Sequence, residues 1–416
     1  MSTAVTDAPV AAAAATALET KAPITQRGLK ATVKLVESKT GRPAAEMLAE
    51  ATKLAYGRNK LQPEEYFDLG LFDPALSKAE REAFVGHKKS AIVNRSLNGV
   101  LGKSASTIDD KLKLSALLRG FGLGATETQA LVDKTSGGPL KSLATPDDAA
   151  AFLREQAVYP LFGKPKNSSL SLGAASIDRF EEKEDSLVHH SGVRTKVETF
   201  VKEVFEAYGE TGYIFQSRLG PHPDLATVSG PAVGTVRVVT LHRGSHIDVL
   251  YALWKAPALG ATADNFWRGD NMIVDIDAET GRTRRCQRGT GAHAEELQNH
   301  PGTGAAMINV QMPMWPELRQ LVRASAWIFP DVPLLGWDVA ITPDGPMIIE
   351  GNTSPHHMLH QMAARRGLLT PDFISAHQET KARITALKES GEARSKSKSK
   401  GWRKNYIRNL IWGGSD

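Results

Sequence analysis

The segment from Gly336 to Asn352, GWDVAITPDGPMIIEGN, most strongly constrains the fold of this chain. Two apolar runs flank Pro343-Asp344-Gly345, a combination typical of a tight turn, so the segment predicts a β-hairpin. Asp338 lies in its first strand, and Glu350 and Asn352 end its second. Because strand side chains alternate between faces, Glu350 and Asn352 are expected to project to the same face.

Asp338, Glu350 and Asn352 bring two carboxylates and an amide to one end of the predicted hairpin. Oxygen ligands without Cys or His suit a hard ion such as Mg²⁺, which takes further oxygens from water and phosphates. On these residues alone, a polar strand end followed by a turn at GNTSP is an equally good interpretation.

The remaining patterns predict helices first and mostly antiparallel strands later, an α+β fold. Helical spacing and Gly57 indicate a helix in AAEMLAEATKLAYG, and Ser77 with Glu80 has the spacing of a capping box. A further helix is expected to open near Thr107, and another at Pro316. β-Branched alternation predicts strands around Arg237 and beyond.

Composition indicates a soluble globular protein of 416 residues with a single cysteine, which fits a reducing cytoplasm. Seven basic residues between Arg394 and Arg408 account for the net charge of +5, so the rest carries about −2 and no nucleic-acid partner is expected. The basic, Trp-containing segment 394–412 suits either a solvated tail or peripheral contact with the inner face of a membrane.

Three further segments are candidates for binding phosphate or nucleotide, although each also fits a structural role. Lys164 precedes a loop of small residues that includes Ser168 and Ser169 and can present backbone amides to anions. The strand ending in Gln216-Ser217-Arg218-Leu219 breaks at a Gly-Pro pair, as a hinge beside an adenine edge would. Arg237, inside a Val-rich strand, requires an anionic partner, either a structural carboxylate or a substrate group.

The order of these pieces resembles the ATP-grasp superfamily, and more narrowly its sugar-transfer-associated, α-L-glutamate ligase-related members. The broad resemblance is carried by DDKLKLSALLRGFGL, FGKP, IFQSRL, TVRVVTL and the hairpin. The narrow one is carried by QSRLGPHPDL, ADNFWRGDNMIVDIDAETG and the whole hairpin segment GWDVAITPDGPMIIEGN, and it covers roughly Lys60 to Phe373. The resemblance implies two α+β subdomains that clasp ATP, with ATP and Mg²⁺ as cofactors.

The resemblance also implies a role for each candidate residue. Asp338, Glu350 and Asn352 would bind Mg²⁺, and Lys111 and Lys164 would contact ATP phosphates, with Ser168 and Ser169. Gln216, Ser217, Arg218 and Leu219 would form the adenine hinge. Arg237 and Lys164 would be catalytic, while Asn265, Arg268 and His356 would line the acceptor side.

Two departures from the superfamily pattern and one histidine motif qualify these roles. Ser217 stands where the superfamily often has glutamate, and the small-residue loop has only Gly173. In HHMLHQM, His356 and His360 have the spacing of a zinc pair, but His357 replaces the glutamate that H-E-x-x-H needs. These histidines are instead expected near the acceptor pocket or at the start of a helix.

The sequence thus predicts an ADP-forming ligase that joins a carboxylate to an amine through an acylphosphate, for example an amino acid to a sugar acid or peptide. A kinase on the same fold, or a non-catalytic ATP-binding protein anchored by its basic tail, remain alternatives. The expected divisions are a disordered tail (1–29), a helical region (30–104), a first subdomain (105–219), a second subdomain with the metal site (220–375), and a helix with the basic tail (376–416).

Overall fold

The computed structural model of the chain contains two compact units, each described below by itself. The described residues are 28–100, 102–133, 140–166, 173–261, 264–267 and 270–389. Residues 129–133 and 142–215 form most of the smaller unit, and residues 28–128 and 216–389 most of the larger one. The expected N-terminal and basic C-terminal tails fall almost wholly outside the described residues.

The larger unit begins with seven helices, as the sequence predicts for its first hundred residues. They are α1 (Leu29–Thr40), α2 (Ala44–Tyr56), α3 (Pro63–Asp68), α4 (Lys78–Ala83), α5 (His87–Asn98), α6 (Ala105–Ile108) and α7 (Lys111–Gly120). Gly57 ends α2, and the capping box of Ser77 and Glu80 opens α4. The expected helix start at Thr107 is wrong: Thr107 lies in α6, and the Asp110 carboxylate caps α7 by accepting two backbone N–H groups.

The smaller unit is built on a seven-stranded sheet with the order β2-β1-β7-β3-β4-β5-β6. Its strands are β1 (Thr128–Val132), β2 (Ser142–Leu143), β3 (Leu161–Pro165), β4 (Ala175–Glu181), β5 (Ser186–His189), β6 (Arg194–Lys196) and β7 (Tyr213–Ser217). Helices α8 (Pro146–Glu155) and α9 (Val197–Tyr208) bury their apolar faces against it through Phe152 and Phe200.

The larger unit holds the second seven-stranded sheet, whose strands follow the order β12-β11-β10-β9-β8-β13-β14, every described pair antiparallel. They are β8 (Thr235–His242), β9 (Ile247–Ala256), β10 (Met272–Ile276), β11 (Thr283–Arg288), β12 (Glu295–Leu297), β13 (Leu334–Thr342) and β14 (Gly345–Asn352). The predicted hairpin is therefore confirmed as β13–β14, at one edge of this sheet.

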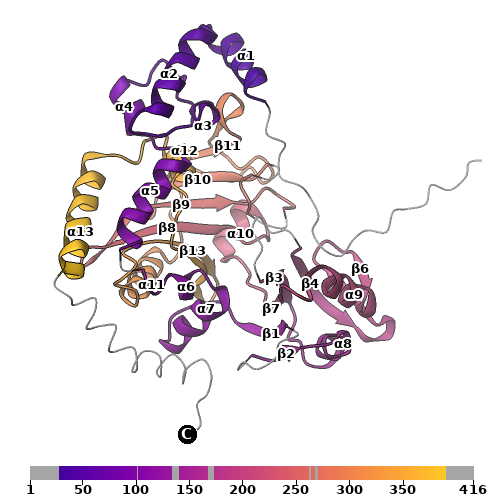
Figure 1. Ribbon diagram of the computed structural model, residues 1–416. Coiled ribbons are helices and arrows are strands. Elements are labelled where there is room, and N and C mark those ends of the chain that lie inside the picture. The colour runs from indigo at the N-terminus through magenta and orange to yellow at the C-terminus, as the bar shows by residue number, and fades with distance from the viewer. Residues whose placement is uncertain are drawn as a thin grey trace, which may run out of the picture. The chain divides into compact units, whose positions relative to one another are not determined.

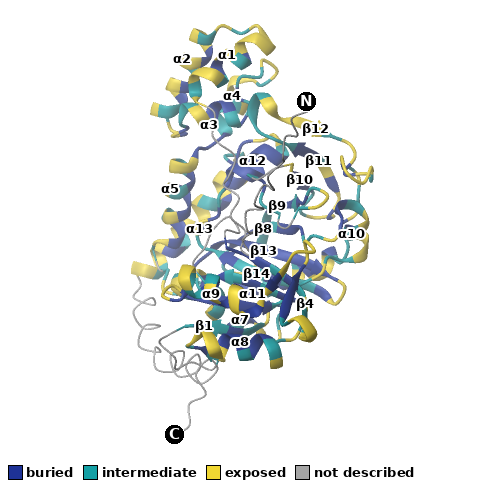
Figure 2. Cartoon of the chain, turned by 90° about the vertical axis from the view of Figure 1, so that its right-hand side faces the viewer, coloured by how far each residue is buried: buried dark blue, intermediate teal, exposed yellow. Residues whose placement is uncertain are grey.

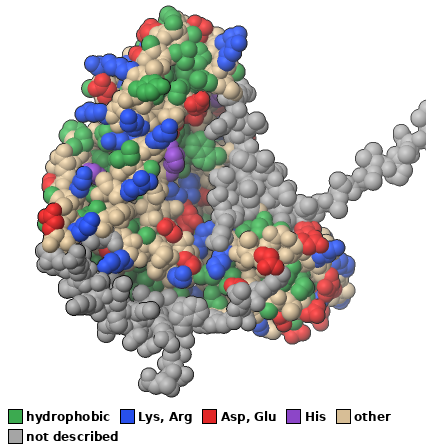
Figure 3. Space-filling model, viewed as in Figure 1, with side chains coloured by type: hydrophobic (Ala, Val, Ile, Leu, Met, Phe, Trp, Pro, Cys, Tyr) green, Lys and Arg blue, Asp and Glu red, His purple; other side chains and the backbone are tan. Residues whose placement is uncertain are grey.

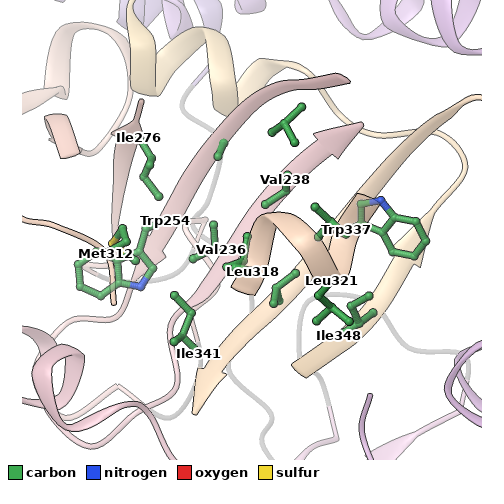
Figure 4. Close-up of a cluster of buried hydrophobic side chains, with 14 of the residues drawn as sticks. Val236, Val238, Trp254, Ile276, Met312, Leu318, Leu321, Trp337, Ile341 and Ile348 are labelled. Carbon is green, nitrogen blue, oxygen red and sulfur yellow. The ribbon is translucent and has the colours of Figure 1, made fainter. Parts of the chain in front are cut away.

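Helices cover both faces of the larger unit's sheet (Figure 1). Helix α11 (Trp315–Trp327) packs Leu318 and Leu321 against Val236 and Trp337 on one face (Figure 4). The other face is covered by α5, α12 (Met358–Ala364) and α13 (Pro371–Glu389), and the short α10 (Pro223–Ser229) precedes β8. Strand β13 is accordingly buried throughout and β8 and β9 are mostly buried, whereas the outer sides of α1 and α2 are exposed (Figure 2).

On the face that Figure 3 shows, the described Lys and Arg side chains lie in separate places among acidic and hydrophobic ones. Within the described residues, none of the helices combines the length and the apolar character needed to cross a bilayer. The proposed membrane contact of residues 394–412 concerns a segment outside this description.

Candidate active site

Three charged residues lie side by side across adjacent strands of the larger sheet. Arg237 on β8 is directly opposite Asp338 on β13, which is directly opposite Glu350 on β14. Directly opposed residues share a face and have Cβ atoms about 5 Å apart. Strand β14 continues through Asn352, opposite Gly336, so Asn352 lies on the same face.

A β-bulge in the hairpin sets this alignment. Val339 is opposite Ile348, but Asp338 is opposite Glu350, so Ile349 is an extra residue in β14. In an unbroken register Asp338 would be opposite Ile349, and Glu350 would point to the α11 side. The bulge therefore places both carboxylates on one face.

Asp338 is the centre of a buried ion-pair network. Arg237 contacts both of its carboxylate oxygens, with Nη2 2.7 Å from Oδ2, and Lys255 Nζ lies 3.2 Å from the same Oδ2. Burial alone would raise the pKa of Asp338, but the charges of Arg237 and Lys255 outweigh it and hold this pKa well below its usual range. Of the two partners considered for Arg237, the structure thus shows the carboxylate.

Two members of the network, Lys255 and Asp264, were missed by sequence reasoning. Lys255 Nζ lies 3.5 Å from the Asp264 carboxylate, which also accepts hydrogen bonds from the backbone N–H and hydroxyl of Thr235. A lysine within the apolar strand LYALWKA was an available signal, because a buried ammonium group requires an anionic partner. Nothing in the local sequence indicates that its partners are Asp338 and Asp264.

Glu350 has a different electrostatic environment from Asp338. Its nearest described cation is Lys111 at the start of α7, with Nζ 3.8 Å from Oε2. Burial, followed by the charge of Asp338, raises the pKa of Glu350, and Lys111 only partly opposes this. A carboxylate whose ionisation is disfavoured by burial and by an adjacent carboxylate forms a site that a further cation would stabilise.

These residues fit a hard divalent cation. Asp338 and Glu350 supply carboxylate oxygens, and Asn352 adds an amide whose Nδ2 is buried without a partner in the described part of the chain. Within that part, there is no group of three or more His, Cys, Asp or Glu side chains arranged to hold a metal. His356 and His360, which have the spacing of a zinc pair but were not expected to bind zinc, are thus not part of such a group there, whereas the hairpin offers the oxygen set that Mg²⁺ prefers.

The two buried histidines after β14 have structural contacts. His357 is fully buried, with Nδ1 2.6 Å from the Tyr251 hydroxyl and Nε2 2.9 Å from Asn94 Oδ1. His360 stacks on Tyr251 with 3.9 Å between ring centroids. His357 immediately precedes α12, so of the expected locations the start of a helix applies to it.

The remaining predicted contacts lie elsewhere in the chain. Lys164 is in β3 of the smaller unit. Gln216 is buried at the end of β7, and its side-chain amide donates to the Thr126 and Thr128 hydroxyls, 3.1 and 3.2 Å away. Ser217 donates its backbone N–H to Glu127, and Arg218 and Leu219 follow outside regular structure.

On the predicted acceptor side, Asn265 follows Asp264 directly, and its Oδ1 accepts the backbone N–H of Trp267 at 3.1 Å. The ring of His356 lies beside that of His87, the first residue of α5. Ser168, Ser169 and Arg268 fall outside the described residues.

Several solved structures share features of this fold at low sequence identity. The ATP-grasp ligase PsnB complexed with a minimal precursor is 16% identical (TM-score 0.34; 67% of this chain, 62% of that chain). The D-alanine-D-alanine ligase from Coxiella burnetii is 13% identical (TM-score 0.38; 71% of this chain, 63% of that chain). The L-amino acid ligase from Bacillus licheniformis is 12% identical (TM-score 0.36; 67% of this chain, 48% of that chain). The chain thus spans less than two thirds of each of these proteins.

No curated protein matches the chain. A family profile, described as sugar-transfer associated ATP-grasp, does match, over residues 98–373. That span contains α7, both sheets and every member of the network around Asp338 and Glu350. On the strength of this match over well above half of its length, the chain belongs to the sugar-transfer associated ATP-grasp family.

Proposed function

We propose that the protein is an ATP- and Mg²⁺-dependent ligase that joins a carboxylate to an amine and releases ADP. The observation that carries the proposal is the alignment of Asp338 with Glu350, flanked by Arg237, Lys255 and Lys111. Family membership supplies the expectation that ATP is the co-substrate.

The charges of the network support a role for Mg²⁺ in binding ATP. The cations Arg237, Lys255 and Lys111 are matched by the carboxylates Asp338, Asp264 and Glu350, so the cluster itself carries no surplus positive charge. A triphosphate therefore needs additional cations. Mg²⁺, held by Asp338, Glu350 and Asn352, would neutralise charge on the phosphates during transfer.

The chain's own cations have distinct tasks in this proposal. Lys111, which lies close to Glu350, would contact a phosphate, while Arg237 and Lys255 would stabilise negative charge on the phosphoryl group and the activated carboxylate. Lys164, Ser168, Ser169 and the segment Gln216–Leu219 are proposed as further nucleotide contacts.

The proposed reaction has two steps. A carboxylate oxygen attacks the γ-phosphorus of ATP, which gives an acylphosphate and ADP. The nitrogen of an amine then attacks the acyl carbon, the carbon–oxygen bond to phosphate breaks, and one amine proton leaves with the phosphate. Amino acids, sugar acids and peptides are the proposed sources of the two groups.

ADP formation across a panel of carboxylates and amines tests this function, with products identified by mass spectrometry. Glu350→Gln keeps the side chain's size and removes a metal ligand charge, so turnover should fall about a hundredfold or more. Glu379→Gln is the matched control, since Glu379 is an exposed partner of Arg243.

Unchanged turnover in Glu350→Gln would contradict the metal assignment. A stable phosphorylated product formed without any amine would identify a kinase instead. ATP binding without turnover under every combination would identify a non-catalytic nucleotide-binding protein.

A further inference from the structure

Helix α5 forms hydrogen bonds with the segment that follows β14, the strand that carries Glu350. Asn98 donates to the backbone carbonyl of Thr353 at 2.7 Å and exchanges hydrogen bonds with the backbone of Leu334 at 2.6 and 3.0 Å. Asn94, one turn earlier, donates to the carbonyl of Pro355 at 3.0 Å. These bonds join α5, which lies before the family match except for its last residue, Asn98, to the exit of β14.

The same segment returns over the face of the sheet that carries the charged network. A Cβ at Gly336 would lie 2.9 Å from Pro355 Cβ and 3.6 Å from Asn352 Cβ, so the absent side chain makes room for this return. Gly336 is two residues from Asp338 on β13 and therefore shares its face. Residues 352–356 thus border the carboxylate pair.

Two imidazole rings meet at this border. The rings of His356 and of His87, the first residue of α5, have centroids 5.1 Å apart. Neither ring forms a hydrogen bond with another residue in the described part of the chain, unlike His357 next to them. Burial, and then the neighbouring charges of His87 and Arg237, lower the pKa of His356 to about 4, so this ring is neutral at pH 7.

A neutral imidazole suits one reactant of the proposed reaction. An amine must carry a lone pair to attack an acyl carbon, so the second substrate reacts in its uncharged form. An unprotonated imidazole nitrogen accepts a hydrogen bond from an uncharged amine N–H. His356 offers such a nitrogen, and the ring of His87 lies beside it.

We propose that α5 and the segment after β14 form the acceptor side of the site, where His87 and His356 bind the uncharged amino group of the second substrate. This inference rests on the proposed ligase function and extends it to the helical region that precedes the family match. His87 and His356 are substrate-binding residues in this view, and the proton lost by the amine leaves with the phosphate.

The packing of α5 allows the two histidines to be changed without dismantling the helix. Asn94 and Asn98 hold α5 against the sheet, and its Val93 and Leu97 are buried in the core. His87 is exposed at the first turn. His87→Phe and His356→Phe keep an aromatic ring and remove its nitrogen atoms, and His246→Phe, at an exposed histidine beside Asp248, is the matched control.

Hydroxylamine is a suitable probe because it is a small amine that converts an acylphosphate into phosphate and a hydroxamate, which forms a coloured complex with added Fe³⁺. The full-length protein is given MgATP, each carboxylate of the panel and increasing hydroxylamine, and hydroxamate is measured. Each His→Phe variant should raise the half-saturating hydroxylamine concentration about tenfold, the loss of one hydrogen bond, with the KM for ATP unchanged. His356→Gln, which retains hydrogen-bonding atoms, should recover part of the affinity.

The outcomes separate this inference from the proposed function. Hydroxamate production with an unchanged hydroxylamine dependence in both Phe variants would overturn the role of the histidines and leave the ligase function standing. Equal increases in the KM for ATP and for hydroxylamine would indicate a general disturbance of the site and would also overturn it. No hydroxamate from the unsubstituted protein with any carboxylate would overturn the ligase function, and this inference with it.

Discussion

The two faces of the larger sheet come from the same strands yet carry opposite kinds of side chain. Toward α11 the strands present Val236, Val238 and Trp337, all fully buried in one apolar cluster. Toward α5 and α12 the alternate positions present Arg237 and Asp338. A two-residue period thus separates the part of the sheet that stabilises the unit from the part proposed to do chemistry.

Burying the charged face costs free energy, which burying the apolar face does not. Asp338 is only 4% exposed, and it persists as a carboxylate because two cations contact it. A buried ion pair of this kind stabilises a protein little, and often less than apolar residues of similar size would. Its presence opposite a well-packed apolar face is therefore better explained by function than by stability.

The largest expected effect comes from breaking the charged face on one side only. Arg237→Met leaves Asp338 with Lys255 alone, which should lower the free energy of unfolding by about 3 to 5 kcal/mol and abolish turnover. Arg237→Met with Asp338→Leu removes both charges, and Lys255 keeps Asp264 as a partner. We expect this double variant to regain most of the lost stability and none of the activity.

Urea denaturation and ADP release measure the two quantities separately. A double variant less stable than Arg237→Met would show that the ion pair itself stabilises the sheet. It would then be wrong that only the apolar face contributes to stability. Recovery of activity in the double variant would remove Arg237 and Asp338 from the proposed site.

The apolar face should respond in the opposite way. Leu318→Ala in α11 opens a cavity against the sheet and should cost about 2 to 5 kcal/mol. Turnover per folded molecule, measured well below the melting temperature, should stay within about twofold of that of the unsubstituted protein. Leu318 packs in the apolar cluster between α11 and the sheet, on the face opposite Arg237 and Asp338. Leu48→Ala, at a partly exposed leucine of α2, is the control with a small expected loss. A selective loss of activity in Leu318→Ala would contradict the division of roles between the faces.

Features encoded locally were predictable from the sequence. The turn at Pro343-Asp344-Gly345 fixes the hairpin, and alternation then places Glu350 and Asn352 on one face. The Ser77–Glu80 capping box likewise involves residues only three apart. Such patterns need no knowledge of distant partners, which is why they were correct.

Features that depend on distant pairing were not predictable. Lys255 reaches Asp338 only because β9 pairs with β8, which itself pairs with β13, and the extra residue Ile349 appears only in the observed register. Asn94 bonds the backbone of Pro355, 261 residues away. Periodicity identifies which positions are apolar, but strand order and register determine which charged side chains meet.

The smallest expected effect concerns His357, which lies behind the charged face. Burial, then the charges of His356 and Arg237, lower its pKa to about 3, against roughly 6.5 in an unfolded chain. Below pH 6.5 the unfolded chain therefore binds a proton that the folded protein excludes, and stability falls as the pH drops toward 3. By pH 5 the loss from this residue should be about 2 kcal/mol.

His357→Gln should reduce the loss of unfolding free energy between pH 7.5 and pH 5 by about that amount, even though its stability at pH 7.5 is lower because the bonds to Tyr251 and Asn94 are altered. His246→Gln, the same substitution at an exposed histidine, is the control. An identical acid sensitivity in His357→Gln and the unsubstituted protein would mean that the ring is protonated within the fold. The charged face would then extend to His357.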